Sequence, residues 1–417
     1  MSNPTGFKII FCTSTSNTVF DFDDIYIRKE IFSSGGIWTW GRGASGQLGN
    51  NNNANSCNPG KICCNRLDWK CVSASRFSGD HVAAVNIRGS VWAWGGNDAY
   101  QLATGVTTSL SQPCNSQANA QLNIQARKVS TGGGVTSVIS INANSAANGT
   151  NSDGGRTVFG CNANQRAGIN NANTTITTRV AGDTNVVWDH ISHGNGFAVG
   201  VGQIADQDST YHLLVFGDNT AGQLGTGDTT TRNVPTFISC GWYCVSAGNN
   251  HSLGVKRDGT LWAWGCNSVG QLGDGTTVDK SSPVQIGTTK NWKYVSAGGN
   301  FSVAVTCGDA ASFHSQIWTW GLNSTGQLGD NTTTNRSTPV QTADLGSDWR
   351  SVSAGDSHVL AIRSNGTLWA WGTNSQGELG NNSTVNRSSP VQVGSATKWL
   401  SVSAGKCFSA AIRGDCW

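Results

Sequence analysis

A segment of about fifty residues recurs along this chain, and this repetition constrains the fold more than any other feature. The stretch Leu261–Gly287 reads LWAWGCNSVGQLGDGTTVDKSSPVQIG, and close copies begin at Ile317 and Leu368. Weaker copies begin at Ile37, Val91, Thr157 and Leu213. Self-similarity at this period is typical of solenoids and propellers, in which each repeat is one structural unit that packs on its neighbours.

Each copy divides into four short strands. The L-W-A-W-G segment alternates its side chains between two faces, as a β-strand does, and the glycines of G-Q-L-G-D-G-T form the turn that follows. Pro283–Ile286 is a short strand, Trp292–Gly298 is a strand of mostly small residues, and Ser302–Val305 pairs back before the next turn. Four short strands are the content of one propeller blade.

Two independent counts predict the number of blades. The W-G strand ends at seven glycines, namely Gly41, Gly95, Gly160, Gly217, Gly265, Gly321 and Gly372. The V-S-A-G strand also starts seven times, at Val72, Val129, Ile191, Val245, Val295, Val352 and Val402. We therefore predict an all-β, seven-bladed β-propeller of four-stranded blades.

The two ends of the repeat array are expected to share one blade. The array opens with a W-G strand and closes with a V-S-A-G strand followed by Phe408–Ile412, so neither end holds a whole blade. Pairing the two ends would close the ring and leave no large unpaired edge. Ile37–Trp38 and Cys416–Trp417 both fit the closing strand, and the sequence leaves the choice between them open.

The chain is predicted to have two parts, with residues 37–417 forming the propeller and residues 1–36 forming an N-terminal attachment segment and hinge. Apolar residues alternate with polar ones in part of this segment, which favours a strand with one buried face over a frayed terminus. The residues expected to anchor the chain are Phe20, Phe22, Ile25, Tyr26 and Ile27.

The composition argues against two classes of partner. The formal net charge is only +3 and 12% of the residues are charged, so no broad basic surface for nucleic acid is expected. The N-terminus lacks the order of a secretion signal, and no run of about eighteen apolar residues occurs. We predict no nucleic-acid partner and no membrane insertion.

The core W-x-W-G-x-N-x-x-G-Q-L-G, the P-V strand and V-S-A-G-x-x-H-S resemble the repeat of the regulator of chromosome condensation family. The likeness covers residues 37–417, although Gln101–Ala103 lacks the second glycine and Asn164–Gly168 keeps little of the motif. The resemblance implies a seven-bladed propeller, and it is similar in type to propellers of this family in tailed phages. It does not fix the function, because this fold serves nucleotide exchange, inhibition and adhesion alike.

Residues that could carry chemistry are mostly explained by the repeat. All 17 tryptophans occupy repeated positions, which predicts packing between blades. His81, His251 and His358 share a position that holds Phe or Val in the other copies, so packing is favoured there too. His190 and His193 beside Asp189 are a weak metal alternative, and the spacing of Cys57, Cys63, Cys64 and Cys71 does not match a usual zinc clip.

The turn that leads from the strand after V-S-A-G into the next W-G strand is long in three copies and short in the others. The long copies span residues 142–156, 202–212 and 306–316. Since all copies of one turn lie on one rim of a propeller, these insertions mark a candidate binding rim, with drift in tolerant loops as an equal alternative. The rim residues singled out are Tyr211, His212, Phe313 and His314.

The sequence thus predicts a non-enzymatic structural or binding protein with no catalytic residues, no metal and no cofactor. The favoured hypothesis is a virion-associated propeller, such as a phage capsid or tail decoration, fibre or adhesin. Residues 1–36 would bind other virion proteins, and the outward face would bind a host-surface protein or a glycan. The alternative is a cytoplasmic protein-interaction propeller, such as a guanine-nucleotide exchange factor for a small GTPase.

Overall fold

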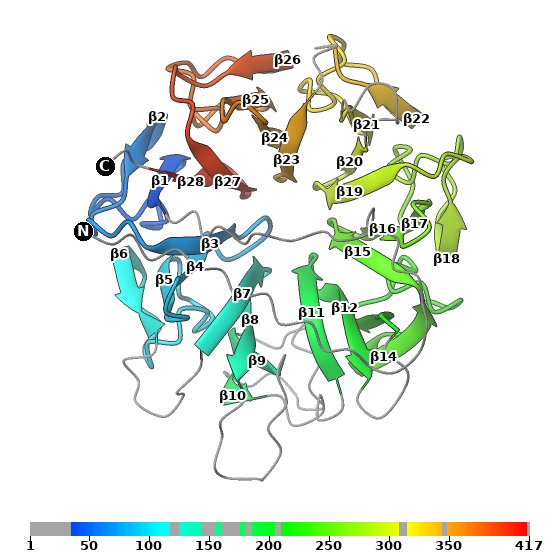
Figure 1. Cartoon of the computed structure of the whole chain (residues 1–417), viewed down its shortest axis with the longest axis horizontal. Helices are drawn as coiled ribbons and strands as arrows, with labels where there is room; N and C mark the ends of the chain where they lie inside the picture. Colours follow the sequence, from blue (N-terminus) through cyan, green and yellow to red (C-terminus); the bar gives the residue numbers. More distant parts are fainter. Residues whose placement is uncertain are drawn as a thin grey trace, which may run out of the picture. The chain divides into compact units, whose positions relative to one another are not determined.

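The computed structural model describes residues 35–116, 125–142, 155–160, 176–179, 186–204, 210–307, 315–343 and 348–414. These residues form seven four-stranded antiparallel sheets, which surround a common axis as the blades of a propeller (Figure 1). The predicted all-β, seven-bladed fold is confirmed. No helix among the described residues is long and apolar enough to cross a lipid bilayer.

Six blades are continuous in the sequence. Blades 1 and 2 consist of β3 (Trp69–Ala74), β4 (His81–Asn86), β5 (Val91–Gly95), β6 (Leu110–Asn115), β7 (Gln125–Gly132), β8 (Val135–Asn142), β9 (Arg156–Gly160) and β10 (Ile176–Arg179). Blades 3 and 4 consist of β11 (Val186–His193), β12 (Phe197–Ile204), β13 (His212–Gly217), β14 (Arg232–Cys240), β15 (Trp242–Ala247), β16 (His251–Lys256), β17 (Leu261–Gly265) and β18 (Lys280–Gln285). Blades 5 and 6 consist of β19 (Trp292–Ala297), β20 (Phe301–Thr306), β21 (Ile317–Gly321), β22 (Arg336–Gln341), β23 (Trp349–Ala354), β24 (His358–Arg363), β25 (Leu368–Gly372) and β26 (Arg387–Gln392).

Blade 7 joins the two ends of the repeat array. It combines β27 (Trp399–Ala404) and β28 (Phe408–Arg413) with β1 (Gly36–Gly41) and β2 (Ser56–Lys61), in the order β2-β1-β28-β27. The register sets Ile37 against Ile412 and Gly41 against Phe408. The expected closure by a shared blade is therefore confirmed, and the strand of Ile37 and Trp38 makes it. Residues 415–417 lie outside the described residues, as do the predicted anchoring residues of the N-terminal segment, namely Phe20, Phe22, Ile25, Tyr26 and Ile27.

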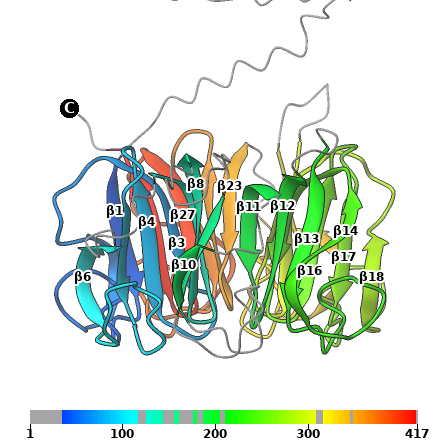
Figure 2. The same ribbon diagram turned by 90° about the horizontal axis from the view of Figure 1, so that it is seen from below.

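The strand directions give the ring two distinct sides. The innermost strand of each blade is the V-S-A-G strand, that is β3, β7, β11, β15, β19, β23 or β27 (Figure 1). It begins on one side of the ring, which we call the entry side, and ends on the other, which we call the loop side (Figure 2). The loop side carries the W-G-x-N-x-x-G-Q-L-G connections, such as residues 266–279 between β17 and β18. The entry side carries the turns between the second and third strands of each blade, together with the connections from one blade to the next.

Tryptophan side chains hold neighbouring blades together. The second tryptophan of the W-x-W pair is fully buried and inserts beneath the G-Q-L-G loop of the preceding blade. In four of the five pairs its indole Nε1–H donates to a loop carbonyl of that blade, as from Trp320 to Gln271 at 2.9 Å and from Trp94 to Gln47 at 2.9 Å, and Trp264 is the exception. The same bond joins Trp40 to Glu378 and Trp371 to Gln327. The predicted role of these tryptophans in packing between blades is thus borne out.

The second glycine of G-Q-L-G is required by the tryptophan that lies against it. Gly273 has a φ of +80°, and a Cβ atom there would come within 2.7 Å of the Nε1 atom of Trp320. The copy that lacks this glycine has Ala103 in its place, with a φ of +55°, and the following blade has Phe159 where a tryptophan would stand. At this interface the smaller ring of Phe159 replaces tryptophan, and the larger residue Ala103 replaces glycine.

This relationship predicts the effect of a pair of alanine substitutions. Gly273→Ala and Gly275→Ala both force alanine to adopt a φ of about +80°. We expect Gly275→Ala to lower the free energy of unfolding by about 1 kcal/mol, because the new methyl group makes only an ordinary contact with Thr338, 3.9 Å away, and the backbone strain alone remains. Gly273→Ala should cost about 1–3 kcal/mol more, because its methyl group collides with Trp320. Chemical denaturation of the two variants measures the difference, and equal losses would contradict this account of the interface.

Candidate functional site

The innermost strands form a hydrogen-bonded ring around the axis. The serine of V-S-A-G accepts a hydrogen bond from a backbone N–H of the next blade, as Ser246 does from Ala297 at 3.0 Å. Equivalent bonds occur at six of the seven interfaces, with serine acceptors Ser73, Ser192, Ser246, Ser296, Ser353 and Ser403. These serines therefore belong to the scaffold and are not candidate nucleophiles.

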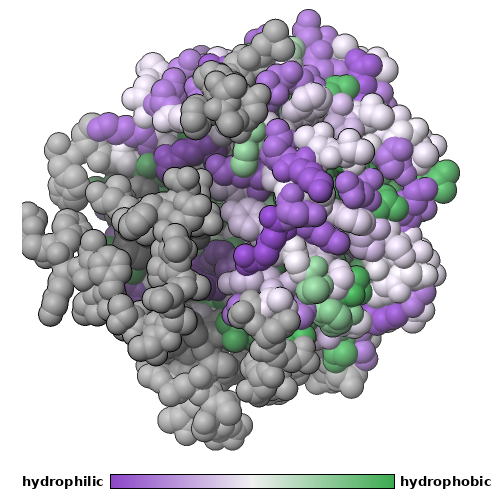
Figure 3. Space-filling model, turned by 45° about the vertical axis from the view of Figure 1, so that its right-hand side comes forward, coloured by the Kyte–Doolittle hydropathy of each residue, from purple (hydrophilic) through white to green (hydrophobic). Residues whose placement is uncertain are grey.

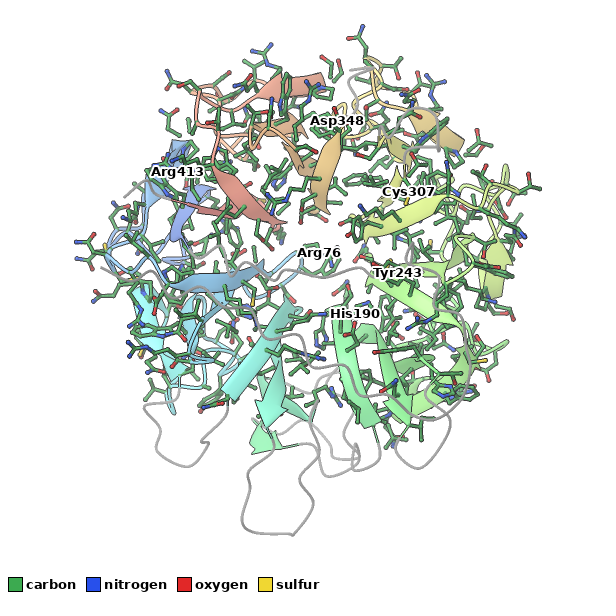
Figure 4. The ribbon with its side chains drawn as sticks, in the orientation of Figure 1. Arg76, His190, Tyr243, Cys307, Asp348 and Arg413 are labelled. Atoms are coloured by element: carbon green, nitrogen blue, oxygen red, sulfur yellow. The ribbon has the colours of Figure 1, made fainter. Side chains whose placement is uncertain are left out.

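Arg76 adds a contact across the axis that the repeat does not predict. It follows β3 on the loop side, and its side chain reaches the centre of the ring (Figure 4). There its guanidinium donates to the carbonyl of Ala297 and, at 3.2 Å, to the hydroxyl of Ser192. Burial lowers the pKa of Arg76 to about 10, so the side chain stays charged at neutral pH. The sequence signal for it is the three-residue insertion that precedes His81.

The interface between blades 2 and 3 departs from the others. His193 occupies the place of the alanine in V-S-A-G, and its Nε2 atom lies 2.7 Å from the Ser137 hydroxyl. Arg127 donates to the carbonyl of Trp188 at 2.7 Å. A cavity of about 310 Å³ lies nearby, lined by residues that include Cys71, Lys128 and His190. The two most divergent copies of the repeat thus meet in an interface with its own contacts.

Four of the seven innermost strands carry a Lys or Arg near their start, on the entry side. One position near the start of the innermost strand varies among the blades. It is the residue after the first tryptophan of that strand, or after Ala126 in blade 2, and the seven copies are Lys70, Arg127, Asp189, Tyr243, Lys293, Arg350 and Leu400. All seven are at least partly accessible to solvent, and Tyr243 is 41% exposed. We call Lys70, Arg127, Lys128, Lys293 and Arg350 the axial basic cluster.

Asp189 is the one acidic residue at this repeated position. Its carboxylate lies 3.7 Å from Arg127 and 3.5 Å from Lys128, and 3.3 Å from the Nδ1 atom of His190. The hydrogen bond from His190 and the two nearby cations hold the pKa of Asp189 well below its usual range. His190 also accepts a hydrogen bond from the backbone N–H of Val245 at 3.0 Å. Asp189 is thus engaged with blade 2 and His190 with blade 4.

The predicted binding rim is only partly described. Tyr211 lies on the entry side, where the Arg257 guanidinium stacks 4.5 Å from the centre of its ring. His212 is buried beside Phe237, with the two ring centres 5.0 Å apart, so it contributes to packing. Phe313 and His314 lie outside the described residues. The three long turns connect strand ends on the entry side, which is the single rim that the sequence predicts.

Three histidines at one repeated position are buried and electrically neutral. The Nε2 atoms of His81, His251 and His358 lie 2.9–3.0 Å from a hydroxyl of the next blade. Those hydroxyls donate to loop carbonyls, so each histidine is the donor in its own bond. Burial lowers the pKa of His81 to about 4, and that of His251 and His358 to about 3. These residues join blades and are poorly suited to proton transfer at neutral pH.

The cysteines of the described residues likewise give no sign of a reactive site. All ten cysteines in the described part of the chain are free thiols, including Cys57, Cys63, Cys64 and Cys71. Burial raises the pKa of Cys71 to about 11 and that of Cys244 to about 12, which keeps both thiols protonated. No group of three His, Cys, Asp or Glu side chains among the described residues is arranged to hold a metal ion.

The repeated polar residues on the loop side form hydrogen bonds within their own loops. In the loop that begins at Asn267, the side-chain oxygen accepts from Leu272 N–H at 2.9 Å and the side-chain nitrogen contacts Asp274 at 3.1 Å. Asn219, Asn323 and Asn374 repeat the bond to their own leucines. The surface drawn in Figure 3 is mostly hydrophilic, with apolar residues scattered across it. A binding site is therefore better sought where the copies differ.

Comparison with protein-family models finds one repeat throughout most of the propeller. The regulator of chromosome condensation (RCC1) repeat matches residues 34–85, 212–255, 258–305, 314–362 and 365–412. The one long gap between these matches, residues 86–211, contains the divergent copies that begin at Val91 and Thr157.

Among curated proteins, the ultraviolet-B receptor UVR8 of Arabidopsis thaliana is 30% identical over 187 residues, which cover 43% of this chain and 41% of that protein. The probable E3 ubiquitin-protein ligase HERC6 of Homo sapiens is 34% identical over 224 residues, which cover 50% of this chain and 21% of that protein. The matches thus span less than half the length of either relative.

Solved structures share the fold at low sequence identity. Prp20p of Saccharomyces cerevisiae is 17% identical with a TM-score of 0.73, and the alignment covers 92% of each chain. Human WBSCR16 is also 17% identical with a TM-score of 0.75, covering 91% of this chain and 100% of that one. At this identity the likeness concerns the fold alone.

The buried histidines predict how stability depends on pH. Between pH 6.5 and the lowered pKa of His251, the unfolded chain binds a proton that the folded chain does not. Stability should therefore fall as the pH drops below 6.5, by up to about 1.4 kcal/mol per pH unit for each such histidine. His251→Phe, which copies Phe301 and Phe408, should reduce the loss between pH 6.5 and pH 5 by about 2 kcal/mol.

Denaturant unfolding of the wild type and the variant at both pH values measures this difference. His358→Phe serves as a matched variant at the same position of blade 6 and should act similarly. A loss of stability that is unchanged in both variants would contradict the assignment of neutral, buried histidines.

Proposed function

Because the chain belongs to the regulator of chromosome condensation (RCC1) repeat family, we propose that it is a non-enzymatic propeller that binds another protein. The proposed contact surface is the entry side of the ring around the axis. It is centred on the axial basic cluster together with Tyr243. The partner is expected to present an acidic surface, since charge complementarity guides both association and orientation.

The observation that carries this proposal is the contrast between two classes of repeated position. The tryptophans, serines, asparagines and glycines that recur pack or form hydrogen bonds within the ring, and most of them are buried. The position after the inner-strand tryptophan changes from blade to blade and faces solvent. An exposed position that varies within a fixed scaffold is where a propeller can acquire a specific partner without loss of stability.

The similarities favour a protein-interaction propeller, the alternative hypothesis from the sequence, over the virion-associated hypothesis. The study of the Prp20p structure describes its binding to Gsp1p and histones, and Prp20 has also been crystallised with Kap60. Guanine-nucleotide exchange on a small GTPase is the finer form of this proposal. Ligase activity is not included, because the match to HERC6 covers only 21% of that protein. Attachment to a virion through residues 1–36 stays a prediction.

Charge reversal tests the proposed surface. Lys293→Glu together with Arg350→Glu should weaken partner binding at least tenfold, because two of the five cations of the cluster become anions. Lys406→Glu together with Arg387→Glu is the matched control, since both residues are exposed and lie at the loop side. Proteins captured from the native source by the wild type and by the control, but lost by the cluster variant, identify the partner.

Two readouts then separate the coarse proposal from the finer one. Titration calorimetry with the purified partner should reproduce the tenfold difference between the two double variants. If the captured partner is a GTPase, release of a fluorescent GDP analogue should accelerate with the wild type and not with the cluster variant. Equal binding by both double variants would refute the proposed surface, whereas unchanged GDP release would refute exchange activity alone.

A further inference from the structure

In most blades a cation lies over a pair of tryptophans of that blade, namely the tryptophan that begins the innermost strand and the first tryptophan of W-x-W. In blade 4, the Lys256 ammonium is 4.1 Å from the centre of the Trp262 ring and 5.3 Å from that of Trp242. In blade 6, the Arg363 guanidinium is 4.3 Å from Trp369 and 4.8 Å from Trp349. Blade 7 repeats this arrangement with Arg413 over Trp38 and Trp399. Attraction between a cation and an aromatic face stabilises such contacts.

The register shows that these cations occupy one structural position. The tryptophan that begins the innermost strand pairs with Lys256 in blade 4, with Arg363 in blade 6 and with Arg413 in blade 7. Where the paired residue is not a cation, another element supplies one. Asn86 and Gly202 take the position in blades 1 and 3. Arg66 covers Trp69 and Trp92 in blade 1. In blade 3, Arg156 covers Trp188 and Phe216, and Phe216 stands at the place of the second tryptophan of W-x-W, so this pair differs from the others.

Blade 5 keeps the tryptophan pair and lacks the cation. Trp292 and Trp318 are arranged edge to face with ring centres 6.3 Å apart, as the pairs in the other blades are. The residue paired with Trp292 is Thr306, and no Lys or Arg among the described residues lies over either ring. An aromatic site for a cation is thus preserved in blade 5 without its internal occupant.

A pocket is found where the cation is missing. It has a volume of about 470 Å³ and its lining includes Trp292, Trp318, Thr306, Asn291 and Asp274. The pocket lies at the interface between blades 4 and 5. Two further features favour a cationic guest that carries N–H donors. The Oδ1 atom of Asn291 is buried and receives no hydrogen bond. The second feature is the Asp274 carboxylate. Burial raises its pKa, but hydrogen bonds from Thr276 and Asn267 and the charge of Lys280 outweigh burial and lower the pKa.

We propose that the pocket between blades 4 and 5 binds an arginine side chain of a partner protein in the place that Arg363 and Arg413 fill within their own blades. Arginine is the expected residue because three of the four cations that cover an equivalent tryptophan pair are arginines, namely Arg66, Arg363 and Arg413. Its planar guanidinium both stacks on aromatic rings and donates several hydrogen bonds. The inference depends on the proposed function in one respect, which is that the bound arginine belongs to a partner protein.

The test uses capped arginine as a probe of the site itself. N-acetyl-arginine methylamide is titrated into protein labelled with nitrogen-15 at the tryptophan indoles, and the Nε1–H signals of Trp292 and Trp318 are followed by NMR. These two signals should shift together and saturate, whereas the uncharged analogue N-acetyl-citrulline methylamide should bind at least tenfold more weakly. Equal effects of the two probes, or no shift at Trp292 and Trp318 with either, would overturn the proposal.

One substitution should fill the site in blade 5 with a cation of the protein itself, and another should remove the cation from the equivalent site in blade 4. Thr306→Arg should place a guanidinium over Trp292 and Trp318, raise the melting temperature and weaken binding of the probe at least tenfold, while Thr306→Ser should bind as the wild type does. Lys256→Thr should create a second site and add shifts at Trp242 and Trp262. Undiminished binding by a folded Thr306→Arg variant would contradict the assignment.

The source of the arginine and the proposed function are tested separately. A peptide with an internal arginine should compete with the capped probe, whereas much tighter binding of free arginine would show a metabolite site and overturn the assignment to a protein partner. Loss of partner capture in the axial cluster variant, with probe binding intact, would leave this site standing independently of the axial surface.

Discussion

The rest of the propeller depends on the contact between a tryptophan of one blade and the G-Q-L-G loop of the blade before it. The indole ring fills the space beneath the loop, its Nε1–H bonds to a loop carbonyl, and the loop glycine leaves room for the ring. These features are coupled, because a methyl group on Gly273 would meet Trp320, and the copy with Ala103 instead of glycine is followed by Phe159. The strongest sequence pattern is thus explained by packing between blades, and no ligand is needed to account for it.

Closure gives these contacts their collective effect. A linear array of blades would leave strand edges exposed at both ends, whereas pairing of β1 with β28 places the first and last repeats in one sheet. The tryptophan contact is also made across this seam, where Trp40 of blade 7 bonds to Glu378 of blade 6. The ring of serine bonds around the axis likewise crosses it, from Ala74 of blade 1 to Ser403 of blade 7. The two ends of the chain are therefore held by the same contacts as the interior blades.

Sequence periodicity was sufficient to predict the blades, their number and the shared closing sheet, because each depends on residues that recur. The choice of Ile37 and Trp38 as the closing strand required the structure, since two segments fit the pattern equally. The axial basic cluster was missed because the position of Lys293 and Arg350 varies from copy to copy, and a low total charge hides cations that the ring brings together. The vacancy over Trp292 and Trp318 was missed for a related reason, since the cation of blade 1 comes from Arg66, outside the paired strand position. The features specific to this protein therefore lie where the copies differ. They are recognised only when equivalent positions of the seven blades are compared in the structure.

The central claim is that the contacts between blades join seven repeats into one closed ring that opens as a unit. Native-state hydrogen exchange of the backbone amides in β1 and β28 tests this most directly, with β16 and β17 of blade 4 as the internal reference. A closed ring predicts that amides of Gly36–Gly41 and Phe408–Arg413 become exposed only in the global unfolding that exposes Leu253 and Ala263. Exchange of β1 and β28 by a separate, lower-energy opening, while β16 and β17 stay protected, would contradict the claim.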